Sequence, residues 1–284
     1  MTILLHTGVR TATVSTEWTA WDTPFRLVVT DPWAMHRARK LVEEQIGLLV
    51  ATVAPCRDAT SRDALLAELL GAGTRSGAVR PFPYGIAAAA AGADVHRSAP
   101  RPWQQAFASA ARGRDGWRVE PGPSVRSLIA RRCAELVAEA TSCGALVAFG
   151  DDVATSGLAP VGGWRVELRD APDAPTTTVA VDGGAISSVS SVRADRGGRL
   201  QPLVVSGSGR VVRPVWRSVA VAAADAPAAS AACSGALLRG AGAPAWLAGL
   251  GLPALLVDTA GAAHPVGRWP AGHDSDGTDG TFVG

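Results

Sequence analysis

The sequence predicts an α+β fold in which helices pack on a mostly antiparallel sheet. Turn residues are frequent, since the 284 residues include 32 glycines and 19 prolines, and several short β-branched segments follow one another. Strands and helices do not alternate regularly, and no G-x-G-x-x-G follows a strand, which argues against a Rossmann dinucleotide fold. The length is sufficient for one sizeable core.

The N-terminal half is expected to contain one strand followed by helices. Residues 1–15 show no regular pattern, whereas PFRLVVT (24–30) alternates and predicts a strand. Asp31 and Pro32 then supply an N-cap and a first-turn proline for a helix that continues to about residue 53. Further helices are expected at 60–70, 86–93 and 125–140, and a short strand at 116–120.

The C-terminal half is expected to be richer in strands. ALVAF (145–149) reads as a buried strand that ends at a Gly150-Asp151-Asp152 turn. Asp225 is expected to open an Ala-rich helix, and Pro244 a short one. The other expected strands are 164–168, 176–181, 185–189, 215–224 and 253–258. The Gly/Asp-rich residues 271–284 are expected to form a disordered tail.

Composition excludes some classes of partner. The net charge of +2 is too small to indicate nucleic acid or an anionic membrane surface. The apolar stretch 219–240 contains Asp225 and Pro227 and makes a poor membrane span, and the N-terminus lacks a signal-peptide core. The protein is therefore expected to be cytoplasmic. Its four cysteines form no C-x-x-C pair, so buried reduced thiols are favoured over a disulfide or a metal site.

Three segments carry a family resemblance. They are EWTAWDTPFRLVVTDP (17–32), ALVAFGDDVATSG with the following GGWRVEL (145–168), and the strand–helix–helix–strand pattern of 216–270. In order and pattern, residues 16–270 resemble the ApbE family of FAD:protein FMN transferases. The resemblance implies that family's fold, with FAD and Mg²⁺ as ligands. It also implies cleavage of the FAD pyrophosphate and transfer of FMN to a Ser or Thr hydroxyl of an acceptor protein.

The family's metal motif is altered in this chain. Relatives carry A-D-x-x-x-T, whose Asp and Thr bind the metal, and these positions fall on Ser230 and Ser234. Ser234 retains a hydroxyl, and Asp225 is a nearby carboxylate, so these two residues are the candidate metal ligands. Mg²⁺ prefers carboxylate oxygens to neutral hydroxyls. Asp225 is also the expected helix N-cap, which is the more common role for such a residue.

The base region of the family is altered as well. Relatives carry H-x-x-D-P-x-T-G, which falls on PLVVSGSG, so that Pro202 and Val205 replace the His and the Asp. By resemblance, Ser208 stands in the Thr position and is a candidate catalytic residue, and Gly209 is a candidate cofactor-binding residue. His264 and His273 are expected on a surface hairpin and in the tail, and they cannot be assumed to replace the missing base.

Two further motifs supply hydroxyls and carboxylates. The family's A-T-S-G falls on residues 187–190, with Ser188 in the Thr position as a candidate cofactor-binding residue. A plain exposed β-edge explains these serines equally well. The family's G-G-D falls on Gly150, Asp151 and Asp152. The two carboxylates are candidate catalytic residues and Gly150 a candidate cofactor-binding residue, although a solvated turn is an equal alternative.

The remaining candidates bind the cofactor by resemblance. The family's G-G-x-A-K-G falls on GPSVRS (122–127), with Arg126 in the Lys position, where it can contact a phosphate. M-G-T falls on residues 21–23, of which Thr23 matches. Trp21 is suited to stack on an aromatic ligand, or simply to pack on the sheet.

The substitutions fall on polar positions, whereas the apolar pattern of strands and helices is retained. Three hypotheses follow. The first is a working FMN transferase or FAD pyrophosphatase that uses displaced groups. The second is a catalytically inactive pseudoenzyme that binds flavin or a partner protein, and the third performs different chemistry in the same pocket on another ligand. The sequence favours the second and leaves the oligomeric state open.

Overall fold

Most of the expected strands are present in the computed structural model, and the majority of them lie in one large sheet. The structure describes residues 2–5, 13–21, 23–53, 123–170, 174, 176–194, 200–202, 214–269 and 281–283. The fold is α+β with a mostly antiparallel sheet, as the sequence predicts. The segments expected at 60–70, 86–93 and 116–120 lie outside the described residues.

The main sheet has eight strands, and every neighbouring pair is antiparallel. Its order is β13 (Ala263–Val266), β12 (Ala254–Asp258), β11 (Trp216–Ala223), β8 (Ala185–Ser190), β5 (Asp152–Ser156), β4 (Ala145–Phe149), β3 (Thr23–Val29) and β2 (Val14–Ala20). Strand β8 therefore lies inside the sheet, between β5 and β11. The serines of residues 187–190 are not on an exposed edge.

A second sheet takes strands from both ends of the chain. Its order is β1 (Thr2–Leu5), β6 (Trp164–Arg169), β7 (Thr176–Asp182) and β14 (Thr281–Val283), with β14 parallel to β7. A separate short pair joins β9 (Val192–Ala194) to β10 (Leu200–Pro202). The expectations of an irregular N-terminus and a disordered tail are wrong for β1, the start of β2, and β14. Backbone pairing to a sheet edge builds these strands where the side-chain pattern gives little signal.

Two helical segments begin at the predicted capping residues, Asp31 and Asp225. Asp31 Oδ1 accepts a hydrogen bond of 2.9 Å from the Trp33 backbone N–H, and the short helix η1 (Pro32–Ala34) leads into α1 (Met35–Val53). Helix α5 (Pro123–Thr141) begins earlier than expected, which places Ser124 inside its first turn. The Ala-rich segment forms α6 (Ala226–Arg239), which is followed by η2 (Gly240–Gly242) and α7 (Ala243–Gly249).

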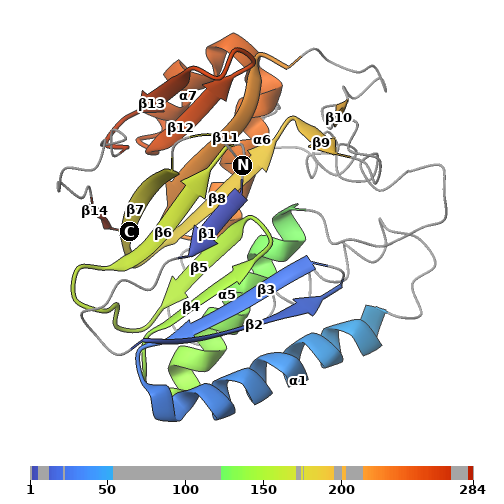
Figure 1. Cartoon of the computed structure of the whole chain (residues 1–284), viewed down its shortest axis with the longest axis vertical. Helices are drawn as coiled ribbons and strands as arrows, with labels where there is room; N and C mark the ends of the chain where they lie inside the picture. Colours follow the sequence, from blue (N-terminus) through green and yellow to red (C-terminus); the bar gives the residue numbers. More distant parts are fainter. Residues whose placement is uncertain are drawn as a thin grey trace, which may run out of the picture.

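Both faces of the main sheet are covered, so its central strands are buried on both sides. Leu27 and Phe149 face helices α1 and α5, and Val219 faces α6 and α7. Leu146 and Ala148 point the other way and pack against β6 and β7. Figure 1 shows this layering, with helices on one side of the sheet and β6 and β7 on the other. Double coverage explains the uninterrupted apolar run of β4.

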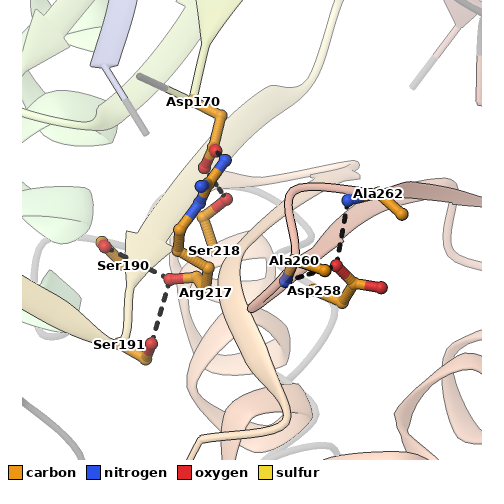
Figure 2. Close-up of polar contacts among 8 residues, drawn as sticks. All are labelled: Asp170, Ser190, Ser191, Arg217, Ser218, Asp258, Ala260 and Ala262. Atoms are coloured by element: carbon orange, nitrogen blue, oxygen red, sulfur yellow. Dashed lines mark hydrogen bonds and ion pairs between the residues drawn. The ribbon is translucent and has the colours of Figure 1, made fainter. Parts of the chain in front are cut away.

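A polar contact ties the second sheet to the main sheet at the end of β6 (Figure 2). Asp170 follows β6 and accepts hydrogen bonds from the side chains of Arg217 and Ser218 on β11. The hydroxyls of Ser190 and Ser191 donate to the Arg217 carbonyl oxygen at 3.2 and 3.1 Å. This contact joins residues 48 positions apart in the sequence, and local patterns do not reveal it.

Burial agrees with the expectation for the thiols. Cys133, Cys143 and Cys233 are free and buried, and Cys56 lies outside the described residues. Within the described ranges, none of the helices combines the length and apolarity needed to cross a lipid bilayer.

Candidate functional site

Three predicted site residues meet at the turn between β4 and β5. Gly150 has φ +61°, and its N–H donates to the Pro24 carbonyl oxygen at 2.9 Å. A Cβ at this position would lie 3.1 Å from Thr23 Cγ2 and 3.4 Å from Arg126 Nε. Glycine is therefore required here both for the left-handed backbone and for the close approach of β3 and α5. The turn brings Thr23, Gly150 and Arg126 together.

Trp21 lies beside this turn in an unusual backbone conformation. Its φ of +52° is rare for a bulky side chain, and the Thr23 hydroxyl donates to its carbonyl oxygen at 3.2 Å. The indole is half-buried, with its centroid 6.0 Å from that of Phe149. Strain of this kind persists only where the surroundings hold it, and it is common at functional sites.

Asp152 is the buried centre of the site. It is 1% exposed, and the Ser187 hydroxyl donates to its Oδ1 at 2.6 Å. The Ser230 side chain also hydrogen-bonds to it, and Arg126 Nε lies 3.8 Å from Oδ2. The expected solvated turn is therefore wrong for Asp152, which is the first residue of a buried strand. Asp151 stays in the turn and is half-buried.

The surroundings of Asp152 strongly change its acidity. Burial raises its pKa from 3.8 to about 7, and the charge of Asp151 adds to this effect. The Arg126 guanidinium and the hydrogen bonds from Ser187 and Ser230 act in the opposite direction and only partly offset burial. At neutral pH the carboxyl is therefore divided between its charged and its neutral form.

Secondary structure fixes the two serines that bind Asp152. Ser187 is paired with Asp152 across the β5–β8 ladder, and its hydroxyl also lies 3.4 Å from the Ala226 carbonyl oxygen at the start of α6. The Cys233 thiol donates to the Ser187 carbonyl oxygen at 3.1 Å, and burial raises the pKa of this thiol well above its usual value. Ser230 is 2% exposed on α6. Sequence reasoning did not select Ser187 or Ser230 as site residues, although Ser230 was identified as the position of the family's metal-binding Asp.

Ser188 points to the opposite face from Ser187, because neighbouring residues in a strand alternate. Its backbone N–H donates to the Asp151 carbonyl oxygen at 2.9 Å, so it helps to fix the turn. Its hydroxyl is buried and has no hydrogen-bond partner among the described residues. Ser188 is thus close to the turn, but its side chain is outside the Asp152 contacts.

The two candidate metal ligands lie along α6. Asp225 has extended backbone angles, and its Oδ1 accepts a hydrogen bond of 2.8 Å from the Ala228 N–H, which confirms the N-cap interpretation. Ser234 lies one turn beyond Ser230 and is half-buried. In the described part of the chain, no three His, Cys, Asp or Glu side chains lie close enough to hold a metal ion.

Replacing Asp225 by Ala is expected to lower the free energy of unfolding by about 1 kcal/mol, because the α6 N-terminus loses its cap. Asp225→Asn is the matched control, since asparagine caps as well as aspartate. Urea denaturation measures both variants. Equal losses in the two would mean that the carboxylate charge matters and the cap does not.

The remaining candidates separate into two groups. Ser208, Gly209 and His273 lie outside the described residues. His264 lies in β13, where its Nε2 is 3.1 Å from Asp258 Oδ2 and its ring is 5.2 Å edge-on from Trp216. Asp258 also accepts the N–H groups of Ala260 and Ala262, which shape the hairpin turn (Figure 2). His264 is thus on an exposed hairpin, as expected.

Comparison with known proteins gives one family. A sequence model described as "ApbE family" matches residues 33–256. The apo form of the flavinyl transferase ApbE from Pseudomonas stutzeri is similar in structure, with 17% identity, a TM-score of 0.57, and coverage of 89% of this chain and 94% of that one. The flavin transferase ApbE from Vibrio cholerae is also similar, with 13% identity, a TM-score of 0.53, and coverage of 90% and 98%. The ApbE protein from Thermotoga maritima is similar as well, with 15% identity, a TM-score of 0.51, and coverage of 89% of this chain and 97% of that one. No curated protein matches the sequence significantly.

Proposed function

Because this chain belongs to the ApbE family, we propose that it is a flavin-transferase-like protein that binds a flavin nucleotide without transferring FMN. Asp152 carries this proposal. Its carboxyl group is buried and contacts two serine side chains and one guanidinium. These contacts engage the carboxyl within the protein, whereas a catalytic carboxylate would have to reach the substrate.

The residues around the Gly150 turn support flavin binding. Trp21 is half-buried, and contacts of an indole with a planar ring are favourable. Arg126 carries a fixed positive charge in the first turn of α5, and guanidinium groups pair well with phosphate oxygens. The similar structures from P. stutzeri and V. cholerae are named as flavin transferases. The same two properties, an aromatic face and a cation, suit FAD or FMN.

The residues present do not fit Mg²⁺. This ion prefers several hard oxygen ligands, usually including carboxylates. The family's metal-binding Asp is replaced here by Ser230, whose side chain hydrogen-bonds to Asp152. Asp225 is held by its own helix cap. The proposed role of this chain is therefore to bind the nucleotide or to present it to a partner protein.

One observation favours a different function. A general base works best when its pKa lies near the pH of the reaction, and the pKa of Asp152 is about 7. In this alternative Asp152 accepts the proton of an acceptor hydroxyl, and the protein is a working transferase. Burial opposes it, because Asp152 is 1% exposed and both its oxygens face protein groups.

Incubation of the purified protein with FAD and Mg²⁺ tests the proposal. Chromatography measures AMP and FMN, and flavin fluorescence measures binding. We expect saturable binding without AMP release. AMP release that Asp152→Asn abolishes and Asp151→Asn retains would instead establish an enzyme that cleaves FAD. Failure of both FAD and FMN to bind would leave the protein-binding form of the pseudoenzyme hypothesis.

A further inference from the structure

We propose that Arg126 supplies the positive charge that a divalent cation supplies in a metal-dependent site of this kind, so that the protein binds its phosphate-bearing ligand without a metal ion. Arg126, Asp152, Ser187 and Ser230 are called the Asp152 cluster below. The inference rests on the proposed function only for the identity of the ligand, because the metal independence of the cluster can be measured without flavin.

The charges within the Asp152 cluster balance without a metal. Asp152 contributes one negative charge when ionised, Arg126 contributes one positive charge, and the two serines are neutral. The guanidinium Nε lies 3.8 Å from Asp152 Oδ2, and the two side chains are 18% and 2% exposed. A pair this deeply enclosed is only weakly screened by solvent. A dication added here would meet the Asp152 carboxylate, which already has a cationic neighbour, and beyond it the charge of Asp151 in the adjoining turn.

The backbone around the cluster holds Arg126 in place. Gly150 has no side chain, and this leaves room for the Arg126 Nε, which would lie 3.4 Å from a Cβ at that position. The Arg126 side chain is 18% exposed, so it is not completely enclosed by the protein groups around Asp152. The helix that carries Arg126 packs on β4 and β5, so core packing fixes the backbone from which this side chain extends.

The serine hydroxyls complete the arrangement. Ser187 donates to Oδ1, and the β5–β8 register fixes its position opposite Asp152. Ser230 binds the same carboxyl from α6. The Ser230 hydroxyl therefore hydrogen-bonds to the Asp152 carboxyl, whereas an aspartate at residue 230 would repel the ionised Asp152. The serine at residue 230 is thus matched to its neighbours.

Ser230→Asp tests the inference, with Mn²⁺ and Mg²⁺ alone as probes and Ser230→Asn as the uncharged control of similar size. We expect the wild-type protein to show no stoichiometric Mn²⁺ binding by electron paramagnetic resonance and no change in Tm with millimolar Mg²⁺. Ser230→Asp places a second carboxylate beside Asp152. Its Tm should fall in the presence of a chelator and rise by several degrees with either metal. The control should not respond to metal.

Each outcome of the metal experiment is decisive. One Mn²⁺ bound per wild-type chain, or a wild-type Tm that rises with Mg²⁺, overturns the proposal. A folded Ser230→Asp variant that ignores both metals overturns the assignment of residue 230. These measurements contain no flavin, so they stand even if the proposed flavin binding fails.

A second variant keeps the inference testable if Ser230→Asp does not fold. Arg126→Gln should weaken FMN and FAD binding by about tenfold or more, because a charged contact to phosphate is lost. Mg²⁺ should not restore flavin binding to Arg126→Gln. The affinity of the wild-type protein for FMN and FAD should be the same in Mg²⁺ and in chelator. Affinity that depends on Mg²⁺ in the wild type, or that Mg²⁺ restores in Arg126→Gln, contradicts the proposal.

Discussion

Asp152→Asn is expected to remove a large part of the pH dependence of stability. The pKa of Asp152 is 3.8 in its ordinary state and about 7 in the folded protein. Between these values the folded state holds a proton that the unfolded state has lost. The free energy of unfolding contributed by this group therefore falls as pH rises from about 4 to about 7, and it is constant outside this window. The full difference is about 4 kcal/mol.

Urea denaturation at pH 5 and pH 8 measures this effect as the difference between wild type and variant. Asparagine keeps the size of the side chain and cannot ionise, so the variant should gain stability relative to wild type as pH rises. Asp151→Asn is the control: it removes a neighbouring charge that adds to the raised pKa of Asp152, so it should reduce the pH dependence slightly and leave most of it. An Asp152→Asn variant with the wild-type pH dependence would show that the buried carboxyl does not titrate in this range.

Gly144→Ala is expected to be the most damaging of the glycine substitutions. Gly144 precedes β4; its N–H donates to Thr30 Oγ1 at 2.8 Å, and its carbonyl accepts from the Thr30 N–H at 3.0 Å. A Cβ here would lie 1.9 Å from the Leu158 carbonyl oxygen and 2.9 Å from Thr30 Cγ2. Backbone must therefore move to make room, and a loss of about 3 kcal/mol or more in the free energy of unfolding is expected.

Gly47→Ala is the matched control for that substitution. Gly47 lies inside α1 with no atom within 4 Å of its would-be Cβ. Alanine should stabilise this helix by about 0.5–1 kcal/mol, because glycine loses more conformational freedom on folding. Chemical denaturation of the two variants should thus give changes of opposite sign. A Gly144→Ala protein as stable as wild type would mean that Leu158 can move away from Gly144 without loss.

The sequence predicts the strands and helices that have a strong local signal. Asp31 and Asp225 cap helices where an acidic residue and a proline stand together. Strand β4 is a short apolar run between turn residues and was predicted correctly. Strand β5 was missed because it begins with Asp152 and has a polar end, and these features are typical of a solvated turn. Its burial results from neighbours on β8, α5 and α6, which are distant in the sequence.

Pairing between strands was harder to predict than the strands themselves. The segments 164–168, 176–181 and 185–189 look alike in composition, yet β6 and β7 belong to the second sheet and β8 to the main one. No local property separates them. Ser187 is inside the protein because β5 and β11 flank it, whereas the same serine-rich pattern is typical of an edge.

Some residues of the candidate site could be identified from the family motifs, and others could not. Thr23, Gly150, Arg126 and Asp152 do lie together. The motif could not show that Asp152 turns inward, because this depends on hydroxyls contributed by Ser187 and Ser230 from two other elements. The contacts of Ser187 and Ser230 with Asp152 can be recognised only once the β5–β8 register and the position of α6 are known.

The pairing of β3 with β4 has a consequence for synthesis on the ribosome. These neighbours join residues 23–29 to residues 145–149, and the Gly144–Thr30 contact spans 114 positions. The β2–β3 hairpin therefore leaves the ribosome long before its partner strand, with one edge unpaired. Exposed strand edges associate with other chains. The nascent β2–β3 hairpin is thus expected to need protection by chaperones during translation.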